Sequence, residues 1–572
     1  MAVSREHRIS IRSVADPTTS IGRRLSRAAP LLDRILGIHL LDRFYQRNDL
    51  VGLPAQRFAE ESLSALGVEI AGAEALAERL PTEGPVIIVA NHPHGGIEGL
   101  VLIKLLAALR PDTKLLANFA LKVFDELKSH FLFVNPLNTR DPANRRGLRD
   151  SLRHLQAGGV LVIFPAGRTS FYQPDLGTIA DSEWSRSVAS LARKSNAKVL
   201  PIRFTGRNSK LFYRLGAIWY RFRLLMLARE LMKMRGQRIE IAVGVAADSS
   251  RLQRYDDETL TSMFRVLCAA LPATNTRSDY TGTQQQPLAA SVDATAITTE
   301  IAALPKAQRA VTAHGMVVGF AARSDIPKLV QQIARERERT FRLLDEGSGQ
   351  PIDTDHFDDR YDHIFCWHER EQALVGAYRV CRGQPAGAAA PTYLHAVFEF
   401  DDAFFPAEGN ALELGRSFIT PEYQRSRHAL DLLWRGIGSY LRAHPDISML
   451  YGTVSLSTQY DAVSTQMICS ALMEAESPVK PRHALAPTLP PEWQRFLETH
   501  VVDLAMLNAL ITAREHDGKG VPVLLRHYAG LGARFHAVGV DRQFANTPGL
   551  LLSVDLATLP ASKRKRYLRR ES

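Results

Sequence analysis

The chain has 572 residues, 45% of them hydrophobic and 23% charged, and carries a formal net charge of +11 at pH 7. This length excludes a single compact core and indicates two to four domains at roughly 150 residues each. The composition is that of an ordinary globular protein. The net positive charge favours an anionic partner, but it does not distinguish nucleic acid from a phospholipid surface.

The cysteines and the apolar stretches indicate which cellular compartment and which kind of membrane contact to expect. Cys268, Cys366, Cys381 and Cys469 are scattered, without the spacing of a disulfide framework or a zinc site. Basic residues near the N-terminus are not followed by an apolar core before Pro30, so we expect no secretory signal. We also find no run of about 18 apolar residues that spans a bilayer. We therefore expect a cytoplasmic protein that meets a membrane only peripherally, on its inner face.

Residues 1–79 are predicted to form a basic, amphipathic helical segment. Within it, residues 31–41 space their apolar side chains as an amphipathic helix does. Four arginines lie nearby: Arg23, Arg24, Arg27 and Arg34. Such a helix either packs on the core of its own domain or lies in an anionic interface, and both interpretations stay open.

Residues 80–270 show the rhythm of a layered α/β domain. Short apolar runs of strand length alternate with helical patterns. The runs are 86–90, 131–134, 160–164, 199–204 and 239–245. In such domains the turns that follow the strands carry the chemistry.

The turn after the first run, residues 91–99, contains an imidazole and, six residues later, a carboxylate. Gly95 and Gly96 allow the backbone to fold back so that His92 and Glu98 meet. His92 then acts as general base on a hydroxyl, with Glu98 fixing its tautomer and stabilising the imidazolium. The alternative is a surface turn with incidental histidines.

The turn after the third run contains Gly167 and Arg168, and the fourth run contains Pro201. Arg168 suits a bidentate grip on a phosphate or carboxylate of a substrate. Alternatively, it is a solvated turn residue.

The composition changes over residues 271–311, which we interpret as a linker. A second domain is predicted over 312–555. It opens with a charged helix at 333–341 and an acidic loop at 353–363. These carboxylates either form a solvated face or hold a cationic amino group and relay its proton.

Residues 556–572 form a polybasic tail that suits an anionic leaflet. Nucleic acid is the competing partner, but we find no nucleic-acid-binding motif and therefore expect none.

The first half resembles the glycerolipid acyltransferase superfamily over residues 80–245. The matching positions are Asn91, His92, Phe164-Pro165-Ala166-Gly167 and Pro201. Glu98 lies one position later than the acid of the common motif, and Ala166 replaces the usual glutamate. With these departures the pattern resembles the branch that acylates lyso-ornithine lipid.

The second half resembles the N-acyltransferases that make lyso-ornithine lipid, which are GNAT-like relatives of acyl-homoserine lactone synthases. The matching positions are Arg337 and Phe341, Asp359 and Asp362, Gly376 and Arg379, and Glu413 with Arg416. The glycine-rich pyrophosphate loop of coenzyme A-dependent relatives is missing from residues 424–429. The resemblance therefore favours an acyl carrier protein as donor.

The two resemblances imply an α/β chain with a layered acyltransferase-like domain followed by an α+β GNAT-like domain. They imply His92, Glu98 and Glu413 as catalytic residues. The implied substrate-binding residues are Asn91, Gly167, Arg168, Pro201, Arg337, Phe341, Asp359, Asp362, Arg379 and Arg416. We expect neither a metal nor a bound cofactor; the phosphopantetheine thioester of acyl carrier protein is the co-substrate.

The implied activity is aminolipid synthesis. A 3-hydroxyacyl group is joined to the amine of ornithine or another amino acid, and the hydroxyl of the resulting lyso-aminolipid is then acylated. Glycine, lysine and glutamine remain open as head groups. A lysophospholipid acyltransferase with a regulatory second domain and a membrane-binding protein without catalysis are the alternatives.

Overall fold

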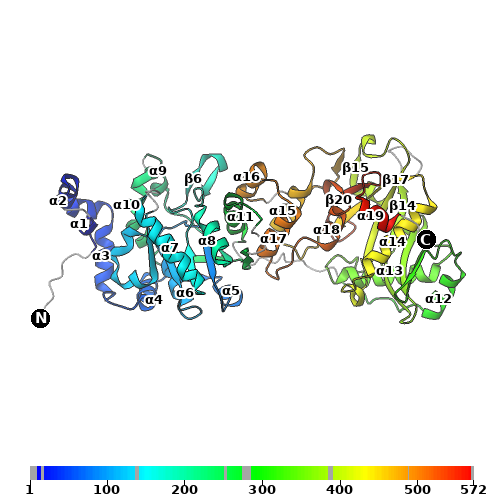
Figure 1. Ribbon diagram of the computed structural model, residues 1–572, viewed down its shortest axis with the longest axis horizontal. Helices are drawn as coiled ribbons and strands as arrows, with labels where there is room; N and C mark the ends of the chain where they lie inside the picture. The colour runs from blue at the N-terminus through cyan, green and yellow to red at the C-terminus, as the bar shows by residue number, and fades with distance from the viewer. Residues whose placement is uncertain are drawn as a thin grey trace. The chain divides into compact units, whose positions relative to one another are not determined.

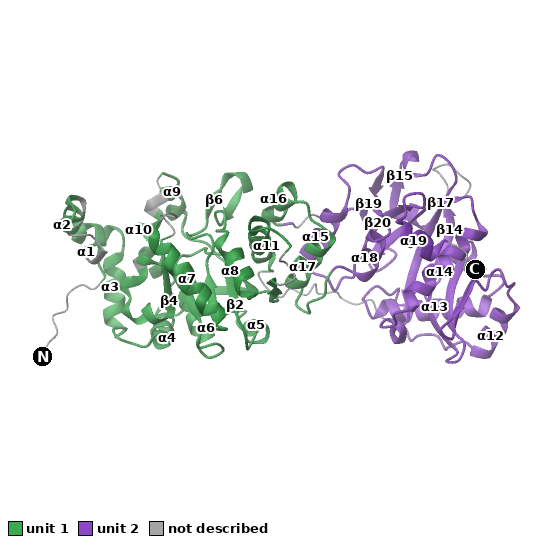
Figure 2. Cartoon of the chain, in the orientation of Figure 1, with its two compact units in different colours: residues 1–276, 490–520 green, residues 277–489, 521–572 purple. Residues whose placement is uncertain are grey.

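The computed structural model describes residues 9–14, 18–135, 141–218, 220–249, 254–272, 285–383, 391–486 and 489–568 (Figure 1). The chain forms two compact units (Figure 2). Unit 1 comprises residues 1–276 and 490–520, and unit 2 comprises residues 277–489 and 521–572.

Unit 1 is built on an eight-stranded sheet of order β1-β9-β8-β2-β5-β3-β4, with β10 paired to β8. The strands are β1 Glu69–Ala71, β2 Val86–Ala90, β3 Lys114–Asn118, β4 Phe131–Val134, β5 Val160–Ile163, β8 Lys198–Phe204, β9 Arg238–Val243 and β10 Ala247–Asp248. The central strand β2 runs parallel to both β5 and β8 and is buried along its length. Central parallel strands are covered on both faces, which explains why they read as unbroken apolar runs. The predicted α/β class is confirmed.

Unit 1 also contains helices within residues 1–276. They are α1 Ile11–Val14, α2 Ser20–Ile35, α3 Ile38–Arg47, α4 Ala55–Leu66, α5 Glu74–Arg79, α6 Ile97–Ala107, α7 Pro142–Gln156, α8 Ser187–Ser195, α9 Lys210–Ile218, α10 Tyr220–Lys233 and α11 Asp257–Ala270. Val86 and Ile88 of β2 share one apolar core with α4 and α6. On the sheet, α11 contacts β2 and β8. The short hairpin β6 Phe171–Gln173 and β7 Thr178–Ala180 follows β5.

Unit 1 also contains α16 Pro491–Thr499 and α17 Leu504–Arg514, which the sequence analysis placed in the second domain. Both helices contact α11. Figure 2 draws them in the green of unit 1. Trp493 is fully buried, and Arg514 Nε donates a hydrogen bond of 2.8 Å to the carbonyl of Ala270. These contacts join segments more than 200 residues apart in the sequence, and no local sequence pattern predicts such a pairing.

Unit 2 is built on an eight-stranded sheet of order β11-β12-β13-β14-β16-β17-β20-β19. The strands are β11 Val311–Ala313, β12 Met316–Ala322, β13 Asp362–His368, β14 Ala373–Gly383, β16 Asn410–Ile419, β17 Ile447–Ser455, β19 Arg534–Asp541 and β20 Thr547–Asp555. Within this sheet β16 and β17 are parallel. Their pairing ends at Leu414 with Gly452; beyond it β16 continues beside β14, and β17 beside β20. The two parallel strands therefore diverge in the middle of the sheet.

The helices of unit 2 are α12 Ala294–Ala303, α13 Pro327–Arg342, α14 Ala429–Ala443, α15 Ala462–Leu472, α18 Val523–Ala529 and α19 Ala561–Tyr567. Short 3-10 turns include η5 His356–Asp359 and η6 Tyr393–Ala396, and β15 Phe398–Phe400 pairs with β18 Val479–Pro481. Among the described residues, no helix combines the length and apolar character needed to cross a membrane.

The structure differs from the predicted linker at α12. Ile297, Ile301 and Leu304 are buried in one core with residues of α13. Their spacing forms a narrow apolar stripe that the surrounding Ser, Thr and Ala obscured. Residues 273–284 of the predicted linker lie outside the described residues.

Candidate active sites

The first candidate site is the turn between β2 and α6. Asn91, the first residue of this turn, makes two hydrogen bonds to the end of β8. Its Nδ2 donates to the carbonyl of Phe204 at 2.9 Å, and its Oδ1 accepts from the Phe204 amide at 2.7 Å. The Asn91 side chain thus fixes the turn to the neighbouring strand.

His92 and Glu98 meet within this turn, as the sequence analysis expected. The Nδ1 atom of His92 lies 3.6 Å from Oε1 of Glu98. Glu98 is completely buried and accepts hydrogen bonds from the amides of His94 at 2.6 Å and Gly95 at 3.0 Å. Gly95 has φ +113°, a conformation that residues with a Cβ rarely adopt. The glycine turn therefore brings the carboxylate beneath the imidazole.

The charges of this pair support a general base. Burial raises the pKa of Glu98, but the charges of His92 and His94 and their hydrogen bonds outweigh it and lower that pKa to about 2. Burial lowers the pKa of His92, but Glu98 and Asp181 outweigh it and the net shift is upward. Glu98 is thus a carboxylate at neutral pH and stabilises a protonated His92.

Asp181, just after β7, is a supporting residue that the sequence analysis missed. It is buried, and its Oδ1 accepts hydrogen bonds from Ser170 Oγ at 2.5 Å and from the amide of His92 at 3.3 Å. Its Oδ2 accepts from Trp184 Nε1 at 3.1 Å. Asp181 belongs to no recognisable sequence motif, and only the fold of the β6–β7 hairpin brings it to His92.

The remaining predicted residues of unit 1 lie around this turn. Gly167 has φ +64° and donates a hydrogen bond to the carbonyl of Phe164, whose ring centroid is 4.4 Å from that of His92. Arg168 is exposed, with Cζ 5.9 Å from the centroid of the Phe171 ring. Pro201 is buried in β8 opposite Val89, where it supports the sheet.

The second candidate site lies where β16 and β17 diverge. Glu413 of β16 is 1% exposed and stands beside Tyr451 of β17, just before the pairing of these strands ends. Its Oε1 accepts a hydrogen bond from Tyr361 Oη at 2.8 Å, and its Oε2 accepts from the amide of Leu394 at 3.4 Å. Burial raises the pKa of Glu413.

Three arginines and three aspartates form a cluster beside Glu413, which we call the arginine–aspartate cluster: Arg337, Arg379, Arg416, Asp353, Asp355 and Asp358. Arg337 lies 2.8 Å from Asp353 and 3.1 Å from Asp358. Arg379 lies 2.7 Å from Asp355 and 3.1 Å from Asp358. Arg416 lies 3.4 Å from Asp353 and adopts φ +48°. Backbone strain of this kind is common at functional sites.

Apart from Nε of Arg337, which lies 2.8 Å from Asp353, two of these arginines keep buried donors without a hydrogen bond. Nε and Nη2 of Arg379 and Nε of Arg416 are buried and have no hydrogen-bond partner in the described part of the chain. Arg379 also approaches the rings of Tyr361 at 4.9 Å and Tyr393 at 5.1 Å. A Cβ placed on Gly415 would lie 3.8 Å from Arg379 and 3.9 Å from Glu413, so these donors lie near the buried carboxylate.

Asp359 and Asp362, predicted as substrate-binding residues, lie outside this cluster. Asp359 is exposed and pairs with Arg323 at 2.8 Å, whereas Asp362 accepts a hydrogen bond from Tyr440 Oη at 2.8 Å. Asp355 and Asp358 have the same spacing four residues earlier. The 3-10 turn η5 explains the difference, because Asp355 caps it while Asp358 points inward.

Two other residues complete this region. Phe341, predicted to bind substrate, is buried in the core with its ring centroid 5.0 Å from that of Phe544. No sequence pattern predicted a role for Glu346. It is 1% exposed, and its Oε2 accepts a hydrogen bond from Ser455 Oγ at 3.0 Å at the end of β17.

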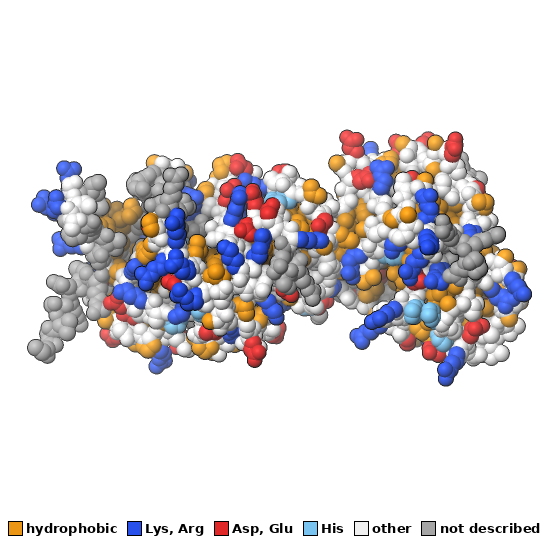
Figure 3. Space-filling model, viewed as in Figure 1, with side chains coloured by type: hydrophobic (Ala, Val, Ile, Leu, Met, Phe, Trp, Pro, Cys, Tyr) orange, Lys and Arg blue, Asp and Glu red, His pale blue; other side chains and the backbone are white. Residues whose placement is uncertain are grey.

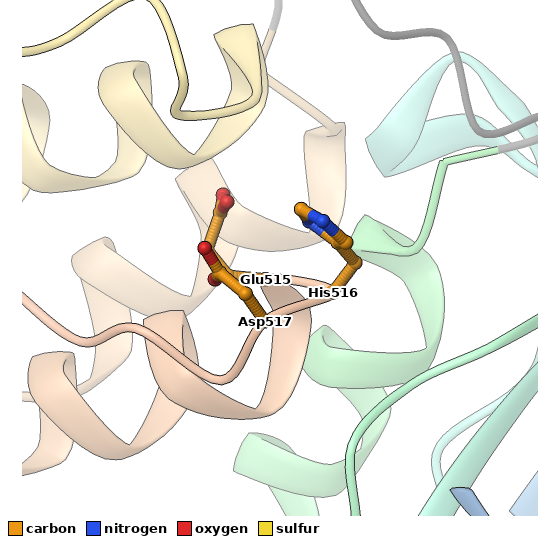
Figure 4. A group of neighbouring side chains, drawn as sticks. All are labelled: Glu515, His516 and Asp517. Carbon is orange, nitrogen blue, oxygen red and sulfur yellow. The ribbon is translucent and has the colours of Figure 1, made fainter. Parts of the chain in front are cut away.

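One group of side chains has the residue types of a metal site. Glu515, His516 and Asp517 follow α17, with candidate ligand atoms within 4.8 Å of one another (Figure 4). Lys519 Nζ lies 3.0 Å from Glu515 Oε2 and 3.1 Å from Asp517 Oδ2. An ammonium group of the chain itself thus lies between these two carboxylates, and we assign no metal site here.

Comparison with known proteins identifies both units. Residues 12–258 match the acyltransferase family model, and residues 337–435 match the model of the acetyltransferase (GNAT) domain. The chain is 29% identical over 255 residues to the glycine N(alpha)-acyltransferase of Bacteroides thetaiotaomicron, covering 40% of this chain and 74% of that protein.

Two further relatives point the same way. The lyso-glycine lipid O-acyltransferase of Bacteroides thetaiotaomicron is 30% identical over 212 residues, covering 35% of this chain and 72% of that protein. The L-ornithine N(alpha)-acyltransferase of Brucella abortus is 33% identical over 138 residues, covering 22% of this chain and 48% of that protein. The chain therefore belongs to the same acyltransferase family as this lyso-glycine lipid O-acyltransferase, and it joins that O-acyltransferase-like unit to a unit with a GNAT domain.

Proposed function

We propose that this acyltransferase makes an ornithine lipid in two steps. Unit 2 transfers a 3-hydroxyacyl group from acyl carrier protein to the α-amine of ornithine, and unit 1 then acylates the 3-hydroxyl of that product. The observation that carries the proposal is the presence in one chain of two acyltransferase units, each with a buried glutamate at its candidate site: Glu98 in unit 1 and Glu413 in unit 2.

In the O-acylation step, His92 removes the proton of the acceptor hydroxyl as the oxygen attacks the thioester carbonyl. Its Nδ1 faces Glu98, which leaves Nε2 for the hydroxyl. The imidazolium then returns the proton to the leaving thiolate. Backbone amides near Gly167 suit the oxyanion that forms between these events.

In the N-acylation step, the free donors of Arg379 and Arg416 bind the carboxylate of the amino acid. Glu413 accepts the proton of its ammonium group, because burial favours the protonated form of this carboxyl. The neutral amine then attacks the thioester, and the thiol leaves as the amide forms.

An acyl carrier protein is the proposed donor for unit 2. The loop before α14 carries the exposed residues Arg425 and Arg427, which suit an acidic carrier, and it lacks the glycines that wrap a pyrophosphate. The divergence of β16 from β17 leaves backbone groups that the amides of a phosphopantetheine arm can pair with. The carrier's thioester thus reaches Glu413 without a bound cofactor.

Peripheral contact with an anionic membrane on its cytoplasmic face completes the proposal. Unit 1 exposes large apolar side chains, with Leu31 of α2 66% exposed and Ile218 of α9 75% exposed. Arg23, Arg24 and Arg27 of α2 are exposed as well. Figure 3 shows basic and hydrophobic side chains intermixed over the visible face of unit 1. Such a mixture suits a leaflet that holds the lyso-lipid acceptor.

Lipid analysis tests the proposal. The full chain is expressed in a host that lacks aminolipids, grown with labelled ornithine and, in a parallel culture, with labelled glycine. We expect a new ornithine-labelled lipid with one amide-linked and one ester-linked acyl chain. Label from glycine alone would change the head group. Altered phospholipid acyl chains with no labelled lipid would instead support a lysophospholipid acyltransferase whose second unit is regulatory.

A further inference from the structure

Glu346 lies in the loop that follows α13, with its side chain turned into unit 2. Its neighbours Leu343 and Leu344 are 59% and 37% exposed, whereas Glu346 is 1% exposed. The amide of Glu346 donates a hydrogen bond of 2.9 Å to the carbonyl of Phe341, near the end of α13. The loop therefore runs along the surface of unit 2 and places one carboxyl in the interior.

This carboxyl is buried without a counter-ion. Its Oε2 accepts a hydrogen bond from Ser455 Oγ at 3.0 Å, and in the described part of the chain no lysine or arginine forms an ion pair with it. Burial raises the pKa of Glu346 to about 7, although the Ser455 hydrogen bond and the charge of Arg416 act in the opposite direction. A buried acid without a cation is unfavourable, and a cationic ligand group offsets that cost.

Aromatic contacts connect this segment to the arginine–aspartate cluster. The ring centroid of Phe341 lies 5.0 Å from that of Phe544, and Cζ of Arg416 lies 4.4 Å from the centroid of the same Phe544 ring. Arg416 follows Glu413 by three residues on β16. One aromatic ring thus contacts both the helix end that holds Glu346 and a guanidinium group proposed to bind the amino-acid carboxylate.

Strand β17 relates Glu346 to Glu413 as well. Tyr451 is the register partner of Glu413, and Ser455, which binds Glu346, is four residues farther along the same regularly paired strand. Side chains four residues apart on a strand share one face, and these two positions are roughly 13 Å apart. The two nitrogens of ornithine are five bonds apart, so the molecule with a hydrogen bond at each nitrogen bridges about 12 Å.

We propose that Glu346 binds the side-chain ammonium group of the amino acid that unit 2 acylates. The inference rests on the proposed N-acylation, in which Arg379 and Arg416 bind the α-carboxylate and Glu413 takes the proton of the α-ammonium group. An ion pair between carboxylate and ammonium is a strong, charge-assisted hydrogen bond. The subsite therefore selects diamino acids over amino acids whose side chain carries no cation, such as glycine and glutamine.

The test compares two acceptors that differ only in this ammonium group. The purified full chain is assayed for amide formation on ornithine and on norvaline, which lacks the δ-amine, with a 3-hydroxyacyl thioester of acyl carrier protein and, in parallel, of coenzyme A. We expect a KM of wild type for ornithine at least roughly tenfold below that for norvaline. Glu346→Gln should raise KM for ornithine roughly ten- to a hundredfold and leave kcat and KM for norvaline unchanged.

The matched control is Glu408→Gln, which removes the same charge from an exposed position of unit 2 and should change neither KM. Three results would overturn the subsite: equal KM values of wild type for the two acceptors, an unchanged KM of Glu346→Gln for ornithine, or equal changes for ornithine and norvaline.

Should Glu346→Gln fail to fold, Ser455→Ala decides, because it removes only the hydroxyl that orients the carboxyl. An increase in KM for ornithine alone supports the subsite, and unchanged values refute it. Wild-type protein that acylates neither acceptor would refute the proposed N-acylation and the subsite with it. Wild-type protein that acylates both equally well would refute the role of Glu346 alone.

Discussion

The two candidate sites are assembled in opposite ways. The His92 site is one turn, in which Asn91, His92 and Glu98 follow one another between β2 and α6. The Glu413 site combines Arg337 of α13, Arg379 of β14 and Arg416 of β16. The aspartates that pair with them lie in the loop between α13 and β13. A site of the first kind is visible as a motif, whereas a site of the second kind depends on strand register and loop conformation.

The sites also differ in how their charges are balanced. In unit 2 the arginine–aspartate cluster contains three cations and three anions joined by ion pairs, with Nε and Nη2 of Arg379 and Nε of Arg416 left without hydrogen bonds in the described structure. In unit 1 Glu98 is matched by His92, but Arg223 lies unpaired beside Arg168 in the described structure. Ion pairs within the cluster balance its charges, whereas no carboxylate in the described structure balances Arg223.

The largest effect is expected from Glu413→Gln. Because the first product supplies the second step, loss of the buried carboxylate removes both the lyso-lipid and the diacylated lipid. General base catalysis contributes roughly 10²- to 10⁴-fold to such a transfer. Lipid extracts of cells with labelled ornithine measure the loss. Added lyso-lipid should still be esterified by this variant, and failure to do so would contradict the independence of the two sites.

His92→Ala should remove only the second product. The lyso-lipid then accumulates, because ester formation falls by roughly 10²- to 10⁴-fold while amide formation continues. Thin-layer separation of the labelled lipids resolves the two species. Normal amounts of the diacylated lipid from this variant would sink the assignment of His92 as the base.

Asp358→Asn tests whether the arginine–aspartate cluster stabilises unit 2, in comparison with the same substitution at Asp359. Asp358 is 1% exposed and pairs with Arg337 and Arg379, so its loss leaves the buried cluster with one positive charge in excess and should destabilise unit 2 by about 3 to 5 kcal/mol. Asp359→Asn, next in sequence but exposed, should change stability by less than about 0.5 kcal/mol. Denaturant unfolding of both proteins measures the difference. Similar losses in both variants would restore Asp359 to the site.

The residues of the two sites show which features could be predicted from the sequence and which could not. The buried strands of unit 1 could be predicted because parallel strands covered on both faces are apolar throughout. The pair His92 and Glu98 could be predicted because a short glycine turn limits where both side chains point. Asp359 and Asp362 were predicted, whereas Asp355 and Asp358, four residues earlier, contact the arginines, because the direction of these carboxylates depends on the 3-10 turn η5. Asp181 and α16 could not be predicted, because only long-range packing brings them to unit 1.

The smallest expected effect concerns Glu346, a buried carboxyl with no motif around it. Burial raises its pKa to about 7 from the ordinary value of 4.5, so between these pH values the folded chain holds a proton that the unfolded chain releases. The stability provided by this proton is complete below about pH 4.5 and is lost as the pH rises through 7.

Gln lacks this titration, so Glu346→Gln should be about 3 kcal/mol more stable than wild type at pH 8 and nearly equal to it at pH 4.5. Thermal unfolding across this range measures the difference, with the exposed Glu408→Gln as control. Parallel pH curves for wild type and both variants would show that Glu346 is ionised in the folded chain. Since its carboxyl contacts Ser455, that result would place a buried negative charge at the end of β17.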